Sequence, residues 1–338
     1  MPEQQDAPAL VIDGGKSKTS VAILDGAGTV VASATGPGLA IISEPGGSDA
    51  LARSLGETLG LVGATGTFHT AVFGLNGVHA PSPHADAAAG ILVGLVRAER
   101  VVVTSDGVLS YVGALGSGFG VAVTVGTGSV ILAVGHDGHA HRVDGNGPLL
   151  GDRGSGYAIG LAGLRAGVRV LEGLEGSAML ADEVRQQFDS ADEAVHRVHA
   201  SPTATRLIAS FSRNVAGAAM RGDVVARAIW HDAGVELAEG AMAAADRAGL
   251  TRQPYPVAWS GGLFEVGDLL REPFAAELAR IAPDAHLHPA GGGAIAGGAV
   301  LAASAGPVMR GVSSWYTADP GGGRLTGMRR TGNHGVGS

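Results

Sequence analysis

Three aspartates stand where a carboxylate can do chemistry. Asp13 directly follows the apolar run ALVI and precedes two glycines, Asp106 ends the run VVVTSD, and Asp152 lies in the glycine-dense run GNGPLLGDRGSG. A carboxylate at the end of a buried strand commonly faces a ligand in α/β sheets, and one beside a phosphate-binding turn can hold Mg²⁺ through water. We therefore expect ligand-facing roles for all three, with helix N-capping as the ordinary alternative for Asp106 and Asp152.

Two glycine and hydroxyl turns separate apolar runs about a hundred residues apart. The first turn consists of Gly14, Gly15, Lys16, Ser17, Lys18 and Thr19, and the second consists of Gly126, Thr127, Gly128 and Ser129. Each is followed, 12 or 11 positions later, by an Asp-Gly turn typical of a hairpin (Asp25 from Asp13, and Asp137 from Gly126). Tight glycine turns let backbone N–H groups approach an anion. The pair predicts a duplicated domain that binds a polyphosphate with two turns.

Three other motifs are weaker. Gly15-Lys16-Ser17 does not form a P-loop, because position 10 is leucine rather than glycine and a strand, not a helix, follows. GGGAIA at 291–296 follows HLHPA rather than a strand, which argues against a dinucleotide site. His136, His139 and His141 flank a turn, and exposed turn polarity explains them more simply than a metal.

Composition limits the class of protein. The chain has 338 residues, 45% of them hydrophobic, a length that suggests two domains. A net charge of −8 and only 4% aromatic residues argue against a nucleic-acid partner or an anionic membrane surface. Cysteine is absent, so the chain offers no disulfide, iron–sulfur ligand or cysteine nucleophile. With no apolar run near the roughly 20 residues of a membrane helix and no signal-peptide pattern, we expect a cytoplasmic protein.

The remaining pattern predicts strands followed by helices in each half, which favours an α/β architecture with mixed sheets. Strands are expected at TAVFGL, ending near Asn76, at VVVTSD and at 256–260. Helices are expected near 48–61, 86–98, 107–115, 155–172, 177–188, 203–218, 223–248, 267–282 and 294–305. The Gly-, Ser- and Arg-rich stretch from Gly311 is expected to be a disordered extension.

Six segments in order resemble one family. DGGKSKT, VVVTSD, VGTGS, GNGPLLGDRGSGYAIG, SGGLFE and PAGGGAIAGGAVLA resemble the BadF/BadG/BcrA/BcrD-type ATPases. Among these the chain looks most like the N-acetylglucosamine kinase branch of the sugar kinase, Hsp70 and actin superfamily, over about residues 9–305, and like an actinobacterial-type member.

The resemblance implies two ribonuclease-H-like (actin/hexokinase-type) domains, each a mixed sheet flanked by helices, around a central cleft that closes on ATP and a sugar. The implied boundaries are 1–112 for the N-terminal domain, 113–310 for the larger C-terminal domain and 311–338 for a flexible tail. A homodimer is the implied assembly.

The resemblance also implies roles for the residues. Gly14 to Thr19 and Gly126 to Ser129 would be the two phosphate loops, and Ser260 to Phe264, with Gly261 and Gly262, would bind adenosine. Asp13 would hold Mg²⁺. Asp106 would be the general base toward a sugar hydroxyl, with Asp152, Asn76 and Gly145 on the other hydroxyls. The two substrates would be ATP and a small amino sugar.

Departures from the family pattern bear on the sugar. The usual GGWG run is Asp144-Gly145-Asn146-Gly147 here, Val130 replaces an asparagine, and Arg153 replaces a glutamate. Because an ammonium prefers carboxylates within hydrogen-bond reach, Asp144 and Asn146 predict recognition of a free amine, and glucosamine as the substrate phosphorylated to glucosamine 6-phosphate.

Three alternatives remain beside glucosamine kinase, and a fourth is excluded. N-acetylglucosamine kinase and broad hexose kinase accept a similar ring. A non-catalytic sugar sensor is disfavoured because Asp13, Asp106 and Asp152 are all retained. The related activators of acyl-CoA dehydratases need cysteines for an iron–sulfur cluster, and this chain has none.

Overall fold

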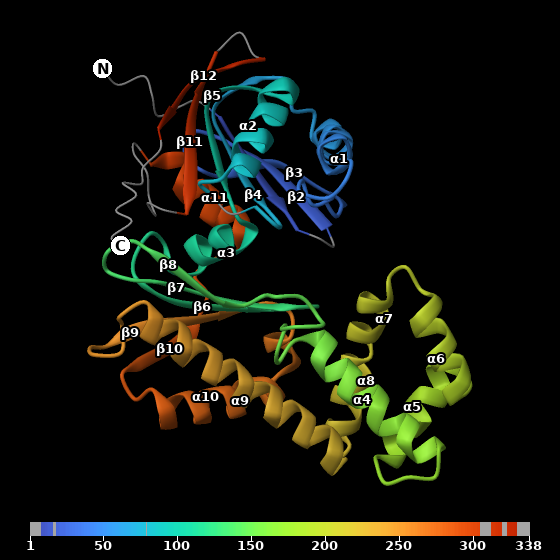
Figure 1. Ribbon diagram of the computed structural model, residues 1–338. Helices are drawn as coiled ribbons and strands as arrows, with labels where there is room; N and C mark the ends of the chain where they lie inside the picture. Colours follow the sequence, from blue (N-terminus) through green and yellow to red (C-terminus); the bar gives the residue numbers. More distant parts are fainter. Residues whose placement is uncertain (1–7, 16–17, 79, 305–311, 320–322, 330–338) are drawn as a thin grey trace, which may run out of the picture. The chain divides into compact units, whose positions relative to one another are not determined.

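A computed structural model describes residues 8–15, 18–78, 80–304, 312–319 and 323–329. The chain divides into two compact units. The first consists of residues 1–119, 134–140 and 290–338, and the second of residues 120–133 and 141–289. Each unit contains one mixed sheet with helices packed against it (Figure 1), as expected from the sequence.

The sheet of the first unit has seven strands in the order β12-β11-β5-β4-β1-β2-β3. Their bounds are β1 (Ala9–Gly14), β2 (Lys18–Leu24), β3 (Val30–Pro37), β4 (Thr67–Leu75), β5 (Arg97–Thr104), β11 (Ser313–Ala318) and β12 (Leu325–Arg329). β1 pairs antiparallel with β2 and parallel with β4, and β4 pairs parallel with β5. The predicted hairpin at Asp25 forms, and the Asp25 carboxylate accepts hydrogen bonds from the backbone N–H groups of Ala27 and Thr29.

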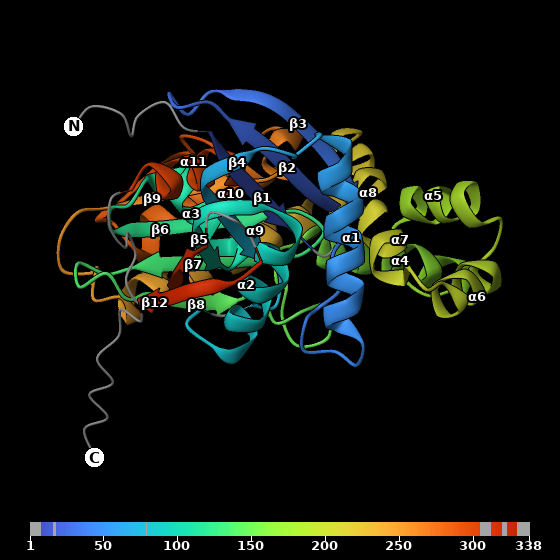
Figure 2. The same cartoon turned by 90° about the horizontal axis from the view of Figure 1, so that it is seen from above.

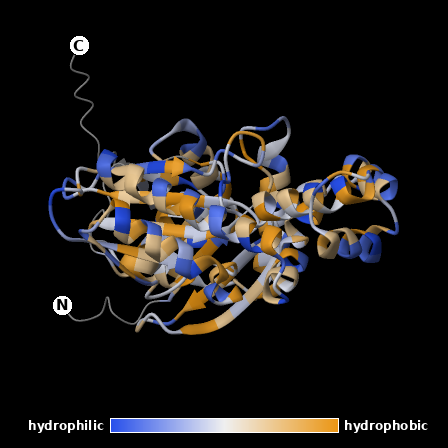
Figure 3. Ribbon diagram, turned by 90° about the horizontal axis from the view of Figure 1, so that it is seen from below, coloured by the Kyte–Doolittle hydropathy of each residue, from blue (hydrophilic) through white to orange (hydrophobic). Residues whose placement is uncertain are grey.

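Both faces of this sheet are largely buried at its central strands β1, β4 and β5, which explains their continuous apolar runs. Leu10 and Ile12 belong to a core with residues of α1 (Gly47–Leu61) and α2 (Pro83–Leu95). Val11, which points to the opposite face, lies against α11 (Ala294–Ala303). Strand residues are mostly hydrophobic and helices alternate in polarity along their length (Figure 3).

The C-terminal part of the chain differs from the prediction. α11 packs on β1, β4 and α3 (Asp106–Leu115), so residues 290–338 belong to the first unit rather than to a domain spanning 113–310. Within the predicted disordered tail, β11 pairs antiparallel with β5 and β12 pairs with β11. The physical reason is burial, because Trp315 and Tyr316 are only 7% and 3% exposed. The two strands lie at one side of the sheet in Figure 1.

The sheet of the second unit has five strands in the order β10-β9-β6-β7-β8. Their bounds are β6 (Gly120–Val125), β7 (Ser129–Val134), β8 (Ala140–Asp144), β9 (Tyr255–Ser260) and β10 (Ala285–Pro289). β9 pairs parallel with both β6 and β10. The run β6-β7-β8 repeats the meander β1-β2-β3 of the first unit, which agrees with the duplication predicted from the two glycine turns.

The helices of the second unit form two groups (Figures 1 and 2). α9 (Val224–Arg247) packs along α10 (Asp268–Ile281), and a short 3₁₀ turn, η1 (Phe264–Val266), precedes α10. The other group consists of α4 (Gly156–Leu171), α5 (Ala178–Phe188), α6 (Ala191–Ala200), α7 (Ala204–Ser210) and α8 (Ser212–Met220). The sequence did not predict α6 or β10, and it merged α7 with α8.

Serine or aspartate begins most of these helices. The side chains of Ser82, Ser105, Ser155, Ser177, Ser190 and Asp223 accept hydrogen bonds from backbone N–H groups in the first turns of α2, α3, α4, α5, α6 and α9. Such caps satisfy N–H groups that have no partner within the helix. Among the described residues, no helix has both the length and the apolar character needed to span a membrane.

Candidate functional site

The first unit brings three predicted residues to one edge of its sheet. β1, β4 and β5 run parallel to one another, so their carboxyl ends meet at the same edge. Asp13 lies at the end of β1, Asn76 directly follows β4, and Asp106 follows β5 after one intervening residue. The backbone N–H of Asn76 donates to the carbonyl of Gly14 at 2.8 Å. This edge is where open α/β sheets bind ligands.

The carboxyl of Asp13 is electrostatically unusual. Burial, and secondly the charge of Asp106, raise the pKa of Asp13 to about 6, while the charge of Lys18 opposes this shift. A half-buried acid next to a second acid is costly to ionise without a compensating cation. The corner formed by Asp13 and Asp106 is therefore suited to a divalent cation with oxygen ligands.

Asp106 is not the N-cap of its helix. Ser105 takes that position, and its hydroxyl accepts a hydrogen bond from the backbone N–H of Val108 at 3.1 Å. Asp106 is the first residue of α3, and its Oδ1 accepts a hydrogen bond from the N–H of Gly107 at 2.9 Å. Helix N-capping, the alternative role considered for Asp106, is thus performed by Ser105. The carboxylate of Asp106 lies at the positive end of the helix dipole.

Close approach of α3 to the sheet depends on Gly74 in β4. A Cβ at position 74 would overlap the side chain of Leu109 on α3. The first turn of α3, with Asp106, is thereby brought close to the strand that precedes Asn76. No pattern in the sequence indicated this role, because a glycine in a strand also fits a bulge.

The first glycine turn is a tight connection between β1 and β2. The N–H of Gly15 donates to the carbonyl of Lys18 at 3.1 Å, and the exposed side chain of Lys18 begins β2. Lys16 and Ser17 lie outside the described residues. Thr19 was expected to donate to phosphate, but its side chain is fully buried and its hydroxyl donates to the carbonyl of Pro37 at 2.6 Å. The structure therefore gives Thr19 a role in joining β2 to β3.

The second glycine turn is bonded to the start of α4. The N–H of Gly156 donates to the carbonyl of Gly126 at 2.9 Å, and that of Tyr157 donates to the carbonyl of Thr127 at 3.0 Å. The hydroxyl of Ser129 donates to the carbonyl of Arg153 at 2.8 Å. The loop Gly126 to Ser129 and the glycine-dense run are consequently one hydrogen-bonded assembly within the second unit.

Asp152 lies directly against this loop. The residue is 9% exposed, and a Cβ at Gly128 would come within 2.7 Å of Asp152 Oδ2. The N-cap of α4 is Ser155, whose hydroxyl accepts a hydrogen bond from the N–H of Ala158, so capping does not explain Asp152. Its backbone has a φ of 57°, in the left-handed region that is uncommon for residues other than glycine, although aspartate tolerates it better than most.

Asp144 does not have the environment expected for amine recognition. The residue is 7% exposed, and its two carboxylate oxygens accept hydrogen bonds from the backbone N–H groups of Asp152 at 2.7 Å and Arg153 at 2.8 Å. The predicted role of Asp144 toward a sugar amine thus loses its main support, because these oxygens are already engaged. Gly145 adopts a φ of 70°, and Asn146 is exposed.

The predicted adenosine segment also reaches this assembly. Gly261 follows β9, and a Cβ there would overlap the backbone of Val125, the residue before Gly126. One strand position earlier, the hydroxyls of Thr124 and Ser260 lie 3.0 Å apart across the parallel pair β6 and β9. Gly262 is exposed. The turn at 260–264 and the second glycine loop therefore occupy one edge of the second sheet.

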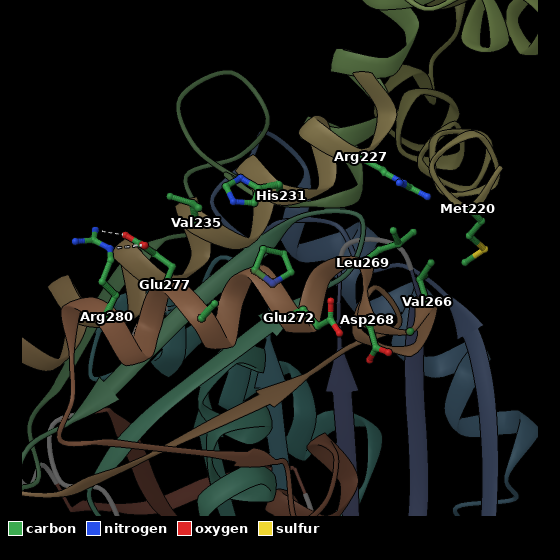
Figure 4. A pocket seen from close by; sticks show the side chains of 13 residues that line it. Met220, Arg227, His231, Val235, Val266, Asp268, Leu269, Glu272, Glu277 and Arg280 are labelled. Atoms are coloured by element: carbon green, nitrogen blue, oxygen red, sulfur yellow. Dashed lines mark hydrogen bonds and ion pairs between the residues drawn. The ribbon is translucent and has the colours of Figure 1, made fainter. Parts of the chain in front are cut away.

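A pocket that the sequence did not predict lies between α9 and α10 (Figure 4). It has a volume of about 790 Å³. One of its lining residues, Val266, lies two positions after the predicted adenosine segment Ser260 to Phe264. Its lining residues are Met220, Arg227, His231, Val235, Val266, Gly267, Asp268, Leu269, Glu272, Pro273, Ala276, Glu277 and Arg280. The positions 227, 231 and 235 on α9 are spaced four apart, a signal that could have identified this helix face.

Two further features of the glycine-dense run were missed. Leu149 and Leu150 are 89% and 85% exposed, an unusual state for adjacent leucines. Arg153 contacts Asp144 through Nε at 3.3 Å and lies 3.9 Å from Glu236. Within the part of the chain that the structure describes, no three or more His, Asp or Glu side chains form a group that could hold a metal ion.

Most of the chain matches one protein family. The sequence model described as the BadF/BadG/BcrA/BcrD ATPase family matches residues 10–297. An N-acetylmuramic acid/N-acetylglucosamine kinase of Clostridium acetobutylicum is 24% identical over 177 residues, which cover 52% of this chain and 58% of that protein. An N-acetyl-D-glucosamine kinase of Dictyostelium discoideum is 26% identical over 179 residues, which cover 52% of this chain and 56% of that protein. The chain thus aligns with little more than half the length of these curated relatives.

A solved structure covers much more of the fold. A Chromobacterium violaceum protein described as a candidate N-acetylglucosamine kinase superposes with a TM-score of 0.68 at 25% identity, over 88% of this chain and 99% of that one. The two-domain α/β architecture expected from the sequence is confirmed by this similarity.

Proposed function

The chain belongs to the BadF/BadG/BcrA/BcrD ATPase family, and we propose that it transfers the γ-phosphoryl group of ATP to a hydroxyl of an amino sugar. The observation that carries the proposal is the arrangement of Asp13, Asn76 and Asp106 at the carboxyl ends of three adjacent strands. The kinase relatives support the reaction class, and the second glycine assembly supports a phosphate-binding role for the second unit.

Asp106 is proposed as the general base. Its carboxylate accepts the proton of the sugar hydroxyl while the hydroxyl oxygen forms a bond to the γ-phosphorus. The bond between that phosphorus and the β,γ-bridging oxygen breaks, and ADP leaves with the electron pair. Ser105 caps α3, and Asp106 is the first residue of that helix, where the positive end of the helix dipole attracts negative charge.

The glycine turns are proposed to bind the phosphates. The N–H groups of Gly15 and Gly126 donate to the carbonyls of Lys18 and Gly128, so other backbone N–H groups of the two turns are the proposed donors to phosphate oxygens. Lys18 neutralises the transferred charge. Gly261 and Gly262 contact adenosine. The adjoining pocket between α9 and α10 provides apolar side chains, including Val266 and Leu269, at the end near this turn.

The residues of the first unit fit a magnesium ion. Asp13, with Asp106 nearby, would hold it, directly or through water, since ionising Asp13 in a half-buried corner beside a second carboxylate is costly without a cation. When bound, Mg²⁺ neutralises phosphate charge in the transferred group.

Asp152, Asn76 and the backbone at Gly145 are proposed to bind sugar hydroxyls. For the 2-amino substituent, we propose an N-acetyl group in preference to the free amine that the sequence favoured. The oxygens of Asp144 accept backbone hydrogen bonds, whereas Leu149 and Leu150 offer apolar surface of the kind that an acetyl methyl contacts. N-acetylglucosamine is therefore the first substrate to test and glucosamine the second.

The test is a coupled ADP-release assay with N-acetylglucosamine, N-acetylmuramic acid, glucosamine and glucose, followed by identification of the phosphorylated product. A higher kcat/KM for N-acetylglucosamine than for glucosamine supports the proposal. Replacing Leu149 by Asn should then raise KM for the N-acetyl sugar more than for glucosamine. A preference for glucosamine would restore the amine argument, and no turnover with any sugar would overturn the proposed reaction.

The role of Asp106 is tested with Asp106→Asn. We expect kcat to fall by about 10²–10⁴ with little change in KM for ATP. Asp49→Asn is the matched control, because Asp49 is an exposed aspartate in the first turn of α1 in the same unit. Near-normal turnover in a folded Asp106→Asn protein would reject the assignment.

The sequence also predicted a homodimer and a cytoplasmic location, and both stay predictions. Light scattering of the purified protein tests the homodimer.

A further inference from the structure

We propose that Asp144 is a positioning residue that fixes the backbone of Asp152 and Arg153, and through it the carboxylate of Asp152. This inference deepens the proposed function, on which the sugar-binding role of Asp152 rests. It replaces direct contact between Asp144 and the sugar with an indirect role.

The contacts of Asp144 are directed at one short segment. Oδ1 accepts a hydrogen bond from the N–H of Asp152 at 2.7 Å, and Oδ2 accepts one from the N–H of Arg153 at 2.8 Å. Oδ2 also lies 3.3 Å from Nε of Arg153. A charged acceptor makes such bonds shorter and stronger than a neutral one does. One side chain at the end of β8 thus holds two consecutive amides eight and nine residues later.

Burial makes these bonds necessary. Asp144 is 7% exposed, and a buried carboxylate without partners is strongly unfavourable. The segment it holds is also constrained, because Asp144 and Asp152 have φ values of 65° and 57°. Left-handed backbone at a residue other than glycine persists only where surrounding contacts fix it.

The opposite side of the segment is fixed by the second glycine loop. Ser129 donates to the carbonyl of Arg153 at 2.8 Å, and Asp152 packs against Gly128. The peptide units at 152–153 are therefore held through their N–H groups by Asp144 and through a carbonyl by Ser129. This arrangement fixes the backbone that carries the Asp152 side chain, which lies beside the loop proposed to bind phosphate.

The chemistry of the side chain allows a selective substitution. Asparagine has nearly the same shape as aspartate, but it offers one acceptor oxygen and one donor NH₂ group. In either orientation of the amide, one of the two backbone N–H groups faces a donor. Asp144→Asn therefore removes one of the two bonds with little change in volume.

The first measurement is amide hydrogen exchange of the Asp144→Asn protein, followed in a peptide that covers residues 150–156. We expect faster exchange there, with the peptides of α9 and β1 unchanged. This measurement does not depend on activity, so it decides the positioning role even if none of the tested sugars is a substrate. Unchanged exchange in this peptide would overturn the proposal.

The second measurement is steady-state kinetics with the sugar that the wild-type chain phosphorylates. Loss of one hydrogen bond to a charged group predicts about a tenfold rise in KM for the sugar, and KM for ATP should change much less. Asp144→Asn combined with Asp152→Asn should behave like Asp152→Asn alone, since Asp144 acts through Asp152. Additive effects of the two substitutions, or an unchanged sugar KM despite faster exchange, would reject the role.

Asp25→Asn is the matched control. Asp25 also accepts hydrogen bonds from two backbone N–H groups at a turn, at 3.0 and 2.8 Å, but it is exposed and belongs to the first unit. It should change neither the exchange of residues 150–156 nor the sugar KM. Arg153→Gln, which keeps both backbone bonds to Asp144, should give a smaller effect than Asp144→Asn.

Discussion

Asp106, the first residue of α3, acts electrostatically on Asp13 at the end of β1 and helps burial to raise the pKa of Asp13 to about 6. The two residues are 93 positions apart, and the parallel pairing of β1, β4 and β5 brings the ends of their elements to one edge. An acid with a raised pKa favours the protonated form in the folded state, so this pair has consequences for both stability and metal binding.

The stability contribution of Asp13 should depend on pH in a defined direction. Because its pKa in the folded state lies above the ordinary value of 3.8, the contribution is complete below pH 4 and is lost as pH rises through about 6. Asp13→Asn mimics the protonated acid. Thermal unfolding without metal should show this variant more stable than wild type at pH 7.5, by on the order of 1–3 kcal/mol, and equal to it near pH 4. A less stable variant at pH 7.5 would contradict the argument.

Activity should require a divalent cation, and protons should compete with that cation for the carboxylate of Asp13. Chelation is expected to abolish turnover and Mg²⁺ to restore it. Because Asp13 must be ionised to hold the metal, the Mg²⁺ concentration for half-maximal rate should rise by about tenfold per unit as pH falls below about 6. The measurement is a Mg²⁺ titration of the rate at pH 5, 6 and 7.5. A half-maximal concentration independent of pH would exclude Asp13 as a ligand.

Gly74 should be sensitive to substitution. A Cβ at this position overlaps the side chain of Leu109 and lies 3.2 Å from the carbonyl of Ser105, so we expect Gly74→Ala to move Leu109 and, with it, the first turn of α3 that carries Asp106. We expect a loss of about 1–3 kcal/mol in unfolding free energy and a lower kcat. Gly90→Ala is the control, since Gly90 is an exposed helical glycine at which an added Cβ would meet open space. That variant should be neutral or slightly more stable.

Substitutions at Thr19 and Lys18 should distinguish a structural role from a phosphate-binding role. Thr19→Val removes a hydroxyl that donates to Pro37 and should cost about 1 kcal/mol of stability with KM for ATP unchanged. Lys18→Ala should lower stability only slightly, because it removes the charge that opposes the pKa shift of Asp13, and it should raise KM for ATP. Unfolding in urea and ATP titration of the rate measure the two effects. If Thr19→Val raised KM for ATP at normal stability, the phosphate role would return to Thr19.

The C-terminal strands should stabilise the first unit. Ending the chain at residue 312 removes β11 and exposes the hydrogen-bonding edge of β5. An exposed strand edge of this kind promotes aggregation. We expect that truncation to cause aggregation on heating. Tyr316→Phe, which loses a 2.7 Å bond to Asp86, should cost about 1 kcal/mol. Thr317→Ala, at an exposed position of the same strand, should change stability by under about 0.5 kcal/mol.

Sequence reasoning alone predicted most of the elements and proposed the residues of the candidate site. The apolar runs, the Asp-Gly turns and the glycine turns predicted β1-β2-β3 and β6-β7-β8, because local turn chemistry and hydrophobic periodicity decide such hairpins. Asp13 and Asp106 were identified for the same reason, since each ends or follows a continuous buried run. Six motifs in order also identified the family.

Only the tertiary structure decided what the side chains contact. Asp144 and Thr19 are polar residues next to glycine turns, and in the sequence both look available to a ligand. In the fold they bind the backbone of Asp152 and Arg153 and of Pro37. The placement of α11 and the C-terminal strands in the first unit was likewise set by long-range pairing with β5 and packing on β1. Contacts between residues that are far apart in the chain depend on which strands pair and in which register, and local patterns do not fix these pairings.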